Sequence, residues 1–459
     1  MVYSSLLYIY GFLPIALLLY YITPKKFREI TLLLLSMLFC GMISLYFLFF
    51  ILAYTFVNFV CASLTKKLRS NEKLAAIPLT LGITFDLLAL FLFRTAYFTW
   101  LHKLIRAPES FYPIGISFFA LSAIGTLIDV YKGRVKADIQ IIRFSLYILF
   151  FPKLLMGPLL RYDSFSRIIY KRRTSLSGLG VGMTIFVKGF AKKVIAADNL
   201  YMLFRAVQSE KVGEISAATA WLGIIAYVFC LYFNLSGIAD MGMGTAYCLG
   251  IRMPQSFNYP LLSTRIKYFA SRWQSQVVQW FRRYITKPLY NICHKKWTRE
   301  IIFVCGWALF MFWYTFNING IICGIILGIF IIIEARLRES KKLDFTGIFY
   351  TFLVVILCAV FLSGNSLVYS VRYLFAMIGA NGDLVDSQSF YLLKSYIVLI
   401  LLAMYASTDL FRNLITRTGN SRLKVALTLV SPLMVIVLLI ICTALISYSG
   451  SSEILIMKL

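Results

Sequence analysis

The sequence predicts an all-α, polytopic integral membrane protein with about eleven to thirteen membrane segments. Only 14% of its 459 residues are charged and 60% are hydrophobic, whereas about a quarter of the residues in soluble domains carry a charge. Residues 30–64 contain no charged side chain, and a helix needs roughly 20 apolar residues to cross the hydrocarbon core. These runs lack the alternation of polar and apolar residues that a membrane-spanning β-barrel would require.

The predicted spans divide the chain into three parts. Residues 1–110 hold N-terminal membrane helices, residues 111–335 form a core of interrupted segments, and residues 336–459 hold C-terminal membrane helices. Conventional spans are expected at 5–22, 30–41, 44–64, 75–100, 301–316, 317–335, 344–363, 390–411 and 424–449. The first span is expected to be retained, because neither a basic n-region nor a small-residue cleavage site accompanies it.

Basic loops predict the orientation of the chain in a plasma membrane. Lys25, Lys26 and Arg28 follow the first span, and the loop after the third span is also basic. Because basic loops stay on the cytoplasmic side, we expect the N-terminus outside the cell. The net charge of +27 then reflects contact with the lipid bilayer, and no nucleic-acid-binding module accompanies it.

The nine cysteines form no Cys-x-x-Cys pair, so we expect neither disulfides nor a metal site.

The core is interrupted by turn residues and charges. Prolines follow aromatic residues or glycine at 112–113, 151–152 and 157–158. Such segments are typical of broken or re-entrant helices around a polar cavity, because exposed backbone is not tolerated against lipid. Residues 266–289 are the clearest example, since they mix arginines with tryptophans in an amphipathic, interfacial composition. Earlier in the chain, Asp86 lies mid-span and should face a cavity or pair with a nearby Arg or Lys.

The core also carries ordered motifs that resemble one family. In chain order they are PIGISFF at 113–119 with DVYKG at 129–133, FFPKLLMGP at 150–158 with RY at 161–162, KGFAKKVIAADN at 188–199, YFNLSGIADM at 232–241, FNYP at 257–260, RW at 272–273, and WFRRY at 280–284 with PL at 288–289. Together they resemble the bacterial membrane-bound O-acyltransferases, in the branch of alginate O-acetyltransferases and teichoic-acid D-alanyltransferases. The resemblance covers about residues 113 to 328.

The resemblance implies a fold and a reaction. Membrane-bound O-acyltransferases are expected to form a ring of tilted helices around a central tunnel. No cofactor is expected to stay bound; the acyl donor is a thioester such as acetyl-CoA or an acyl carrier protein, approaching from inside. A cell-surface glycopolymer, or an extracytoplasmic relay protein, receives the acyl group outside. The residues expected to line the tunnel are Asn234, Ser236, Asp240, Arg272, Trp273, Arg282, Arg283 and Trp313.

Acyl transfer to a hydroxyl needs a base, and the family places histidines at two positions. Here Gln274 follows the Arg-Trp pair, and Tyr314 is the best match to the second position, because Gly324 and Gly328 then fall at the family's downstream glycines. A competing alignment at 306–308 holds no histidine either. The two histidines of the chain, His102 and His294, lie in short basic stretches that favour surface positions.

The replacing residues are poor bases. A phenol has a pKa of about 10 and would need a nearby cation, which Arg272, Arg282 or Arg283 would have to supply to Tyr314. Gln274 can orient groups by hydrogen bonding but cannot accept a proton at pH 7. Asn234 stands where an acidic residue is usual in the family, and Asp240 is the candidate for a buried polar organiser or a structural ion pair.

Three functions therefore stay open at this point. The first is a catalytically degenerate member of a system that O-acylates envelope glycopolymers with acetyl or D-alanyl groups. The second is an active O-acyltransferase that uses Tyr314, Gln274 or a relay partner in place of the histidines. The third is a non-catalytic tunnel, scaffold or transporter subunit for envelope polysaccharide.

Overall fold

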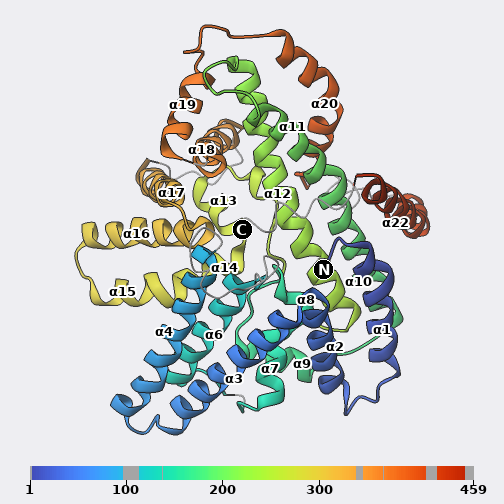
Figure 1. The fold of residues 1–459 in the computed structure, drawn as a ribbon, viewed down its shortest axis with the longest axis vertical. Helices are drawn as coiled ribbons and strands as arrows, with labels where there is room; N and C mark the ends of the chain where they lie inside the picture. The colour runs from blue at the N-terminus through green and yellow to red at the C-terminus, as the bar shows by residue number, and fades with distance from the viewer. Residues whose placement is uncertain are drawn as a thin grey trace. The chain divides into compact units, whose positions relative to one another are not determined.

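The computed structural model describes residues 3–96, 113–136, 138–337, 345–364, 366–409 and 421–449, and these residues form helices and loops without any strand (Figure 1). Seven of the helices are long and apolar enough to cross a membrane. The predicted fold class, an all-α polytopic membrane protein, is confirmed. The total number of membrane segments and the ring around a tunnel stay predictions.

Two compact units divide the chain. Unit 1 contains Met1–Val187 and Ile238–Gln255, and unit 2 contains Lys188–Gly237 and Ser256–Leu459. The chain passes from one unit to the other within helix α10 (Leu176–Ala191) and again within α12 (Ala217–Cys248). The three-part division predicted from sequence character stays a prediction.

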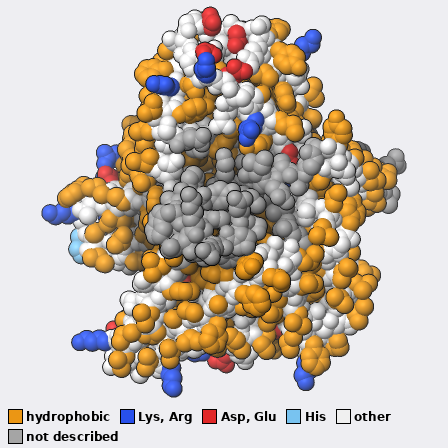
Figure 2. Space-filling model, in the orientation of Figure 1, with side chains coloured by type: hydrophobic (Ala, Val, Ile, Leu, Met, Phe, Trp, Pro, Cys, Tyr) orange, Lys and Arg blue, Asp and Glu red, His pale blue; other side chains and the backbone are white. Residues whose placement is uncertain are grey.

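The helices of unit 1 follow the predicted N-terminal spans. After η1 (Leu7–Phe12) they are α1 (Leu13–Ile22), α2 (Arg28–Ile43), α3 (Leu45–Lys67), α4 (Glu72–Ala96), α6 (Ile116–Tyr131), α7 (Ile141–Leu149), α8 (Phe151–Leu154) and α9 (Tyr162–Tyr170). The extended backbone of Ser44 separates α2 from α3, at the predicted turn. Large apolar side chains such as Leu34, Leu81 and Phe91 are exposed on these helices, as expected for lipid-facing surfaces. Hydrophobic side chains cover much of the face shown in Figure 2.

The basic loops of unit 1 gather at one end. Glu29, in the first turn of α2, pairs with Arg143 at 3.2 Å and with Arg172 at 3.4 Å, and Lys66 pairs with Asp138 at 3.1 Å. These pairs bring together the loops around α1, α3, α7 and α9. Their common side agrees with the positive-inside distribution, while the external N-terminus stays a prediction.

Asp86 has a different partner from the expected one. It is fully buried on α4 and accepts a hydrogen bond from Asn58 Nδ2 on α3 at 2.7 Å. Among the described residues Asp86 forms no ion pair with an Arg or Lys, and the amide of Asn58 is the partner that the structure shows. A neutral amide satisfies one carboxyl oxygen inside the helix pair without adding a second buried charge.

Unit 2 contains the first part of α12, up to Gly237, and a set of further helices. These are η2 (Lys192–Asp198), α11 (Asn199–Gln208), η3 (Pro260–Leu262), α13 (Ile266–Arg272), α14 (Ser275–Phe281), η4 (Arg282–Thr286), α15 (Lys287–Ile292), α16 (Lys296–Thr315), α17 (Ile318–Leu337), α18 (Phe345–Ser363), α19 (Leu367–Met377), α20 (Ser387–Ala406) and α22 (Ser421–Ser449). The predicted break-up of residues 266–289 is confirmed. By contrast α19 falls in no predicted span, because it has only 11 residues.

Helix α12 is continuous where the sequence predicted interrupted segments. It runs for 32 residues, and 89% of its most apolar stretch of 18 residues is buried inside the protein. Its glycines do not break the helix. They allow other helices to approach it closely. A Cβ on Gly237 would lie 2.7 Å from Gly189 O, and one on Gly244 would lie 2.5 Å from Phe186 N. Burial in protein rather than lipid therefore explains how this helix carries polar side chains.

Candidate functional site

A close helical hairpin positions Trp313 and Tyr314. Helices α16 and α17 meet at Phe316, whose φ of +50° lies in the left-handed region. A Cβ on Gly324 would lie 2.4 Å from the carbonyl oxygen of Trp307, and one on Gly328 would lie 2.9 Å from Val304 Cα. The two glycines that guided the motif alignment thus let α17 pack directly on the backbone of α16.

Gln274 forms the joint between α13 and α14 in a strained conformation. Its φ is +41°, which is uncommon for a residue with a Cβ, and its side chain is only 2% exposed. Backbone hydrogen bonds fix the segment on both sides: Asn258 N donates to Arg272 O at 3.1 Å, and Ser275 N donates to Ser256 O at 2.9 Å. Strain held in this way by the surrounding structure is concentrated at functional sites.

Glu334 on α17 anchors the start of α13. Its carboxylate, 4% exposed, accepts the backbone N–H of Ile266 and the backbone N–H of Lys267, both at 3.3 Å. A carboxylate at this place satisfies helix donors that have no partner within the helix and interacts favourably with the positive end of the helix. Because α13 ends at Arg272, this contact helps to position the Arg272–Gln274 segment.

Several buried polar side chains in unit 2 have atoms without a hydrogen-bond partner among the described residues. They include the amides of Gln274 and Asn234, at both their oxygen and nitrogen ends, and the hydroxyl of Ser236. Asn234 and Ser236 are fully buried on α12. Nearly all buried polar groups in proteins have a hydrogen-bond partner, so such groups point to a ligand or an ordered water. Aromatic contact between Tyr232 and Trp273, at 6.2 Å between ring centroids, links this part of α12 to the α13–α14 joint.

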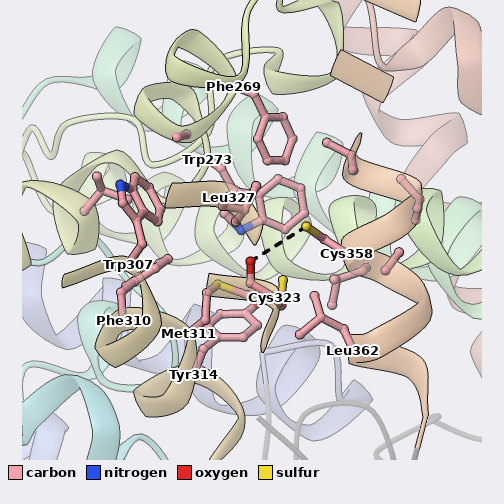
Figure 3. Close-up of a pocket in the computed structure, with 16 residues that line it drawn as sticks. Phe269, Trp273, Trp307, Phe310, Met311, Tyr314, Cys323, Leu327, Cys358 and Leu362 are labelled. Atoms are coloured by element: carbon pink, nitrogen blue, oxygen red, sulfur yellow. Dashed lines mark hydrogen bonds between the residues drawn. The ribbon is translucent and has the colours of Figure 1, made fainter. Parts of the chain in front are cut away.

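Unit 2 contains an apolar pocket between the helices that carry Trp273 and Tyr314. It has an empty volume of about 660 Å³, including its mouth, and side chains from α12, α13, α14, α16, α17 and α18 line it. Trp273 and Tyr314 lie on its wall together with Phe269, Met311 and Leu327 (Figure 3). No described lining residue carries a charge. The chain thus places Tyr314, which matches one of the two expected histidine positions, on the wall of an apolar pocket.

Comparison with known proteins decides the family. No protein-family model matches the chain. The chain is 32% identical to a probable alginate O-acetylase of Azotobacter vinelandii over 348 residues, which cover 74% of the chain and 69% of that protein. It is also 26% identical to the peptidoglycan O-acetyltransferase of Helicobacter pylori, over 83% of the chain and 80% of that protein. The teichoic acid D-alanyltransferase of Bacillus subtilis is 28% identical over 43% of the chain and 51% of that protein. The chain belongs to the membrane-bound O-acyltransferase family.

Family membership confirms the resemblance carried by the ordered motifs, and the structure locates the predicted site residues. Trp313 and Tyr314 are buried on α16, and Arg272 and Trp273 are partly buried at the end of α13. Arg283 is partly buried. The occupation of the family's histidine positions by Gln274 and Tyr314 rests on motif spacing and stays a prediction.

Two predicted site residues are less buried than the rest. Arg282 is exposed, and Asp240 is partly exposed and belongs to unit 1. The role of Asp240 as a polar organiser or a structural ion pair stays a prediction. His294 is exposed, in agreement with the expected surface position, and His102 lies outside the described residues.

Sequence reasoning missed two features of the site. One is Glu334, whose signal was available: it is the single acidic residue in the apolar stretch Ile318–Leu337, and an ionisable residue in such a stretch needs a partner. The other is the contribution of α18 to the pocket through small side chains, including Cys358 and Ala359. No local pattern marks these residues, since their role depends on which helices pack around them.

Proposed function

We propose that this protein is the acyl-binding membrane component of a system that O-acylates a cell-envelope glycopolymer, and that it lacks a general base of its own. The donor is a thioester, of coenzyme A or of an acyl carrier protein, and the acceptor is a hydroxyl of a surface polymer or of a relay protein outside the cell. The relatives named for alginate, peptidoglycan and teichoic acid support the polymer class.

The observation that carries the proposal is the setting of Tyr314. Transfer from a thioester to a hydroxyl needs a group that removes the hydroxyl proton, and an unperturbed phenol of pKa about 10 is protonated at neutral pH. Tyr314 is 7% exposed, on a wall where no described lining residue is Lys, Arg or His. Tyr314 therefore suits hydrogen bonding and packing rather than proton abstraction.

The setting of Gln274, a buried polar residue, supports the same proposal. Its strained backbone and buried amide form a prepared hydrogen-bonding position, and an amide orients an acceptor hydroxyl without accepting its proton. The chain thus retains groups that bind and orient reactants, while the proton-accepting group has to come from a partner protein.

A reconstitution experiment tests the proposal. The purified chain in proteoliposomes, supplied with acetyl-CoA and a polymer hydroxyl acceptor, is expected to form no ester above background. Deleting the gene is expected to lower ester-linked acyl groups on surface polymers, and Gln274→Ala is expected to lower them by weakening acceptor orientation. The double variant Gln274→His/Tyr314→His is expected to gain transfer activity in proteoliposomes.

One result would overturn the proposal. If the wild-type chain alone forms ester and Tyr314→Phe abolishes it while Tyr350→Phe does not, then Tyr314 acts in proton transfer and the chain is a complete O-acyltransferase. Tyr350→Phe is a suitable control because it removes the same hydroxyl from α18, at a residue that is not among the described lining residues of the pocket.

A further inference from the structure

Three buried oxygen atoms of α3 and α4, in unit 1, have no hydrogen-bond partner among the described residues. They are Asp86 Oδ2, Asn58 Oδ1 and the hydroxyl oxygen of Tyr54, and each of these side chains is at most 1% exposed. We infer that the three oxygens bind one alkali-metal cation, Na⁺ or K⁺, between the two membrane helices. This inference goes beyond the proposed function, because α3 and α4 carry none of the residues assigned to acyl transfer.

Two hydrogen bonds fix the orientation of the Asn58 amide. Its Nδ2 donates to Asp86 Oδ1 at 2.7 Å and to the backbone oxygen of Tyr54 at 3.2 Å. Both partners are acceptors, so the amide nitrogen has to face them and the amide oxygen points elsewhere. The carboxylate uses Oδ1 in the same contact and has no donor for Oδ2. Asn58 and Asp86 thus each have one occupied atom and one oxygen that is available to a ligand.

The third oxygen is held beside them by aromatic packing. The ring centroid of Tyr54 lies 5.5 Å from that of Phe85, the neighbour of Asp86, and 5.0 Å from that of Phe119 on α6. The Tyr54 phenol is close enough to interact with the Asp86 carboxyl and the Asn58 amide, although neither bonds to it in hydrogen-bonding geometry. Helices α3, α4 and α6 pack against one another around this point (Figure 1). Unpartnered polar atoms gathered inside a helix bundle point to a bound ion or water.

The charge of Asp86 favours an ion. The closest basic residues along the two helices are Lys66 and Arg94, eight positions from Asn58 and from Asp86 respectively, which is about 12 Å along a helix. Helix α6, Ile116–Tyr131, contains no Lys, Arg or His. A buried carboxylate without a counter-charge is strongly unfavourable, so Asp86 needs a cation or a proton. A proton would satisfy Oδ2 alone, whereas a cation can bind all three oxygens at once.

The donor set and its charge select a monovalent ion. Carboxylate, amide and hydroxyl oxygens suit hard cations rather than transition metals. One carboxylate balances one positive charge, while a divalent ion would leave an uncompensated charge in apolar surroundings. The protein supplies three ligands, and water completes the coordination shell. The cation then links α3 to α4 in the middle of their spans, where an ionisable side chain otherwise destabilises the helix pair.

Thermal unfolding of the full chain in detergent tests the inference without turnover. The unfolding temperature is measured in NaCl, KCl and choline chloride at equal ionic strength. At least one of the two alkali salts should raise it by about 2 °C or more relative to choline chloride, at ten times the half-saturating concentration. The ion that acts at the lower concentration is the preferred occupant of the site.

Three variants locate the effect. Asp86→Asn keeps an oxygen for the contact with Asn58 but removes the charge, so the response to both alkali salts should be lost. Tyr54→Phe keeps the ring and removes one ligand, and the half-saturating concentration should rise about tenfold. Tyr46→Phe is the matched control, because it removes the same hydroxyl from α3 at a side chain that is 62% exposed. It should leave the half-saturating concentration unchanged.

Three outcomes would overturn the inference. Equal stabilisation by choline chloride would show an effect of ionic strength alone. A response that persists in folded Asp86→Asn protein would place the cation elsewhere. An unfolding temperature that changes with pH but with neither alkali salt would show that the site holds a proton, with Tyr54 and Cys61 as the other titratable groups that interact with Asp86. Since the measurement involves no ester formation, its failure leaves the proposed function untouched.

Discussion

Removing the Glu334 carboxylate should loosen α13 and the site that follows it. In Glu334→Leu, the backbone N–H groups of Ile266 and Lys267 lose their acceptor in a buried place. Each of the two unsatisfied buried donors costs about 1–3 kcal/mol, so opening of the first turn of α13 should become easier by about 2–6 kcal/mol. Since about 1.4 kcal/mol corresponds to a factor of ten, amide exchange there should accelerate by a factor between about 30 and about 20,000.

Hydrogen exchange followed by mass spectrometry measures this effect on peptides that cover α13 and Gln274. Glu334→Gln keeps one acceptor oxygen and should fall between wild type and Glu334→Leu. Glu300→Gln is the matched control, because Glu300 on α16 pairs at 2.5 Å with Arg336, whose side chain is 61% exposed. Less than threefold acceleration in Glu334→Leu would refute the anchoring role of the carboxylate.

Further predictions concern stability. Gly324→Leu should force α16 and α17 apart and lower the unfolding temperature, with a destabilisation of about 1–3 kcal/mol, whereas Gly180→Leu should have little effect because nothing lies within 4 Å of its Cβ position. Gln274→Gly should relieve the left-handed strain and raise the free energy of unfolding by about 1 kcal/mol, measured by thermal denaturation in detergent. Asp386→Ala should remove the cap of α20 and cost about 1 kcal/mol. Burial raises the pKa of the Asp386 carboxyl, but hydrogen bonds from Ser389, Ser216 and Thr219 outweigh burial and lower this pKa overall. The stabilisation by the cap should therefore be complete above the unfolded-state pKa and be lost as the pH falls through the lower folded-state pKa. Unfolding measured as a function of pH would show this loss.

The sequence by itself determined the fold class and the family. Charge-free stretches such as residues 30–64 predict membrane helices because hydropathy adds along the chain and does not depend on neighbours in space. The order of the motifs predicted the family, and the spacing of Gly324 and Gly328 pointed to Tyr314. Both glycines proved to pack on α16, which gives that spacing a physical reason.

Only the tertiary structure decided the arrangement of the site. Residues 68 positions apart meet where Glu334 accepts the Ile266 amide, and the strain at Gln274 exists because a distant backbone segment holds it on both sides. The continuity of α12 follows from burial, which makes its glycines and polar side chains tolerable. The pocket is bounded by several helices that are remote in sequence. Burial and cavity shape are properties of packed segments, so no local pattern carries them.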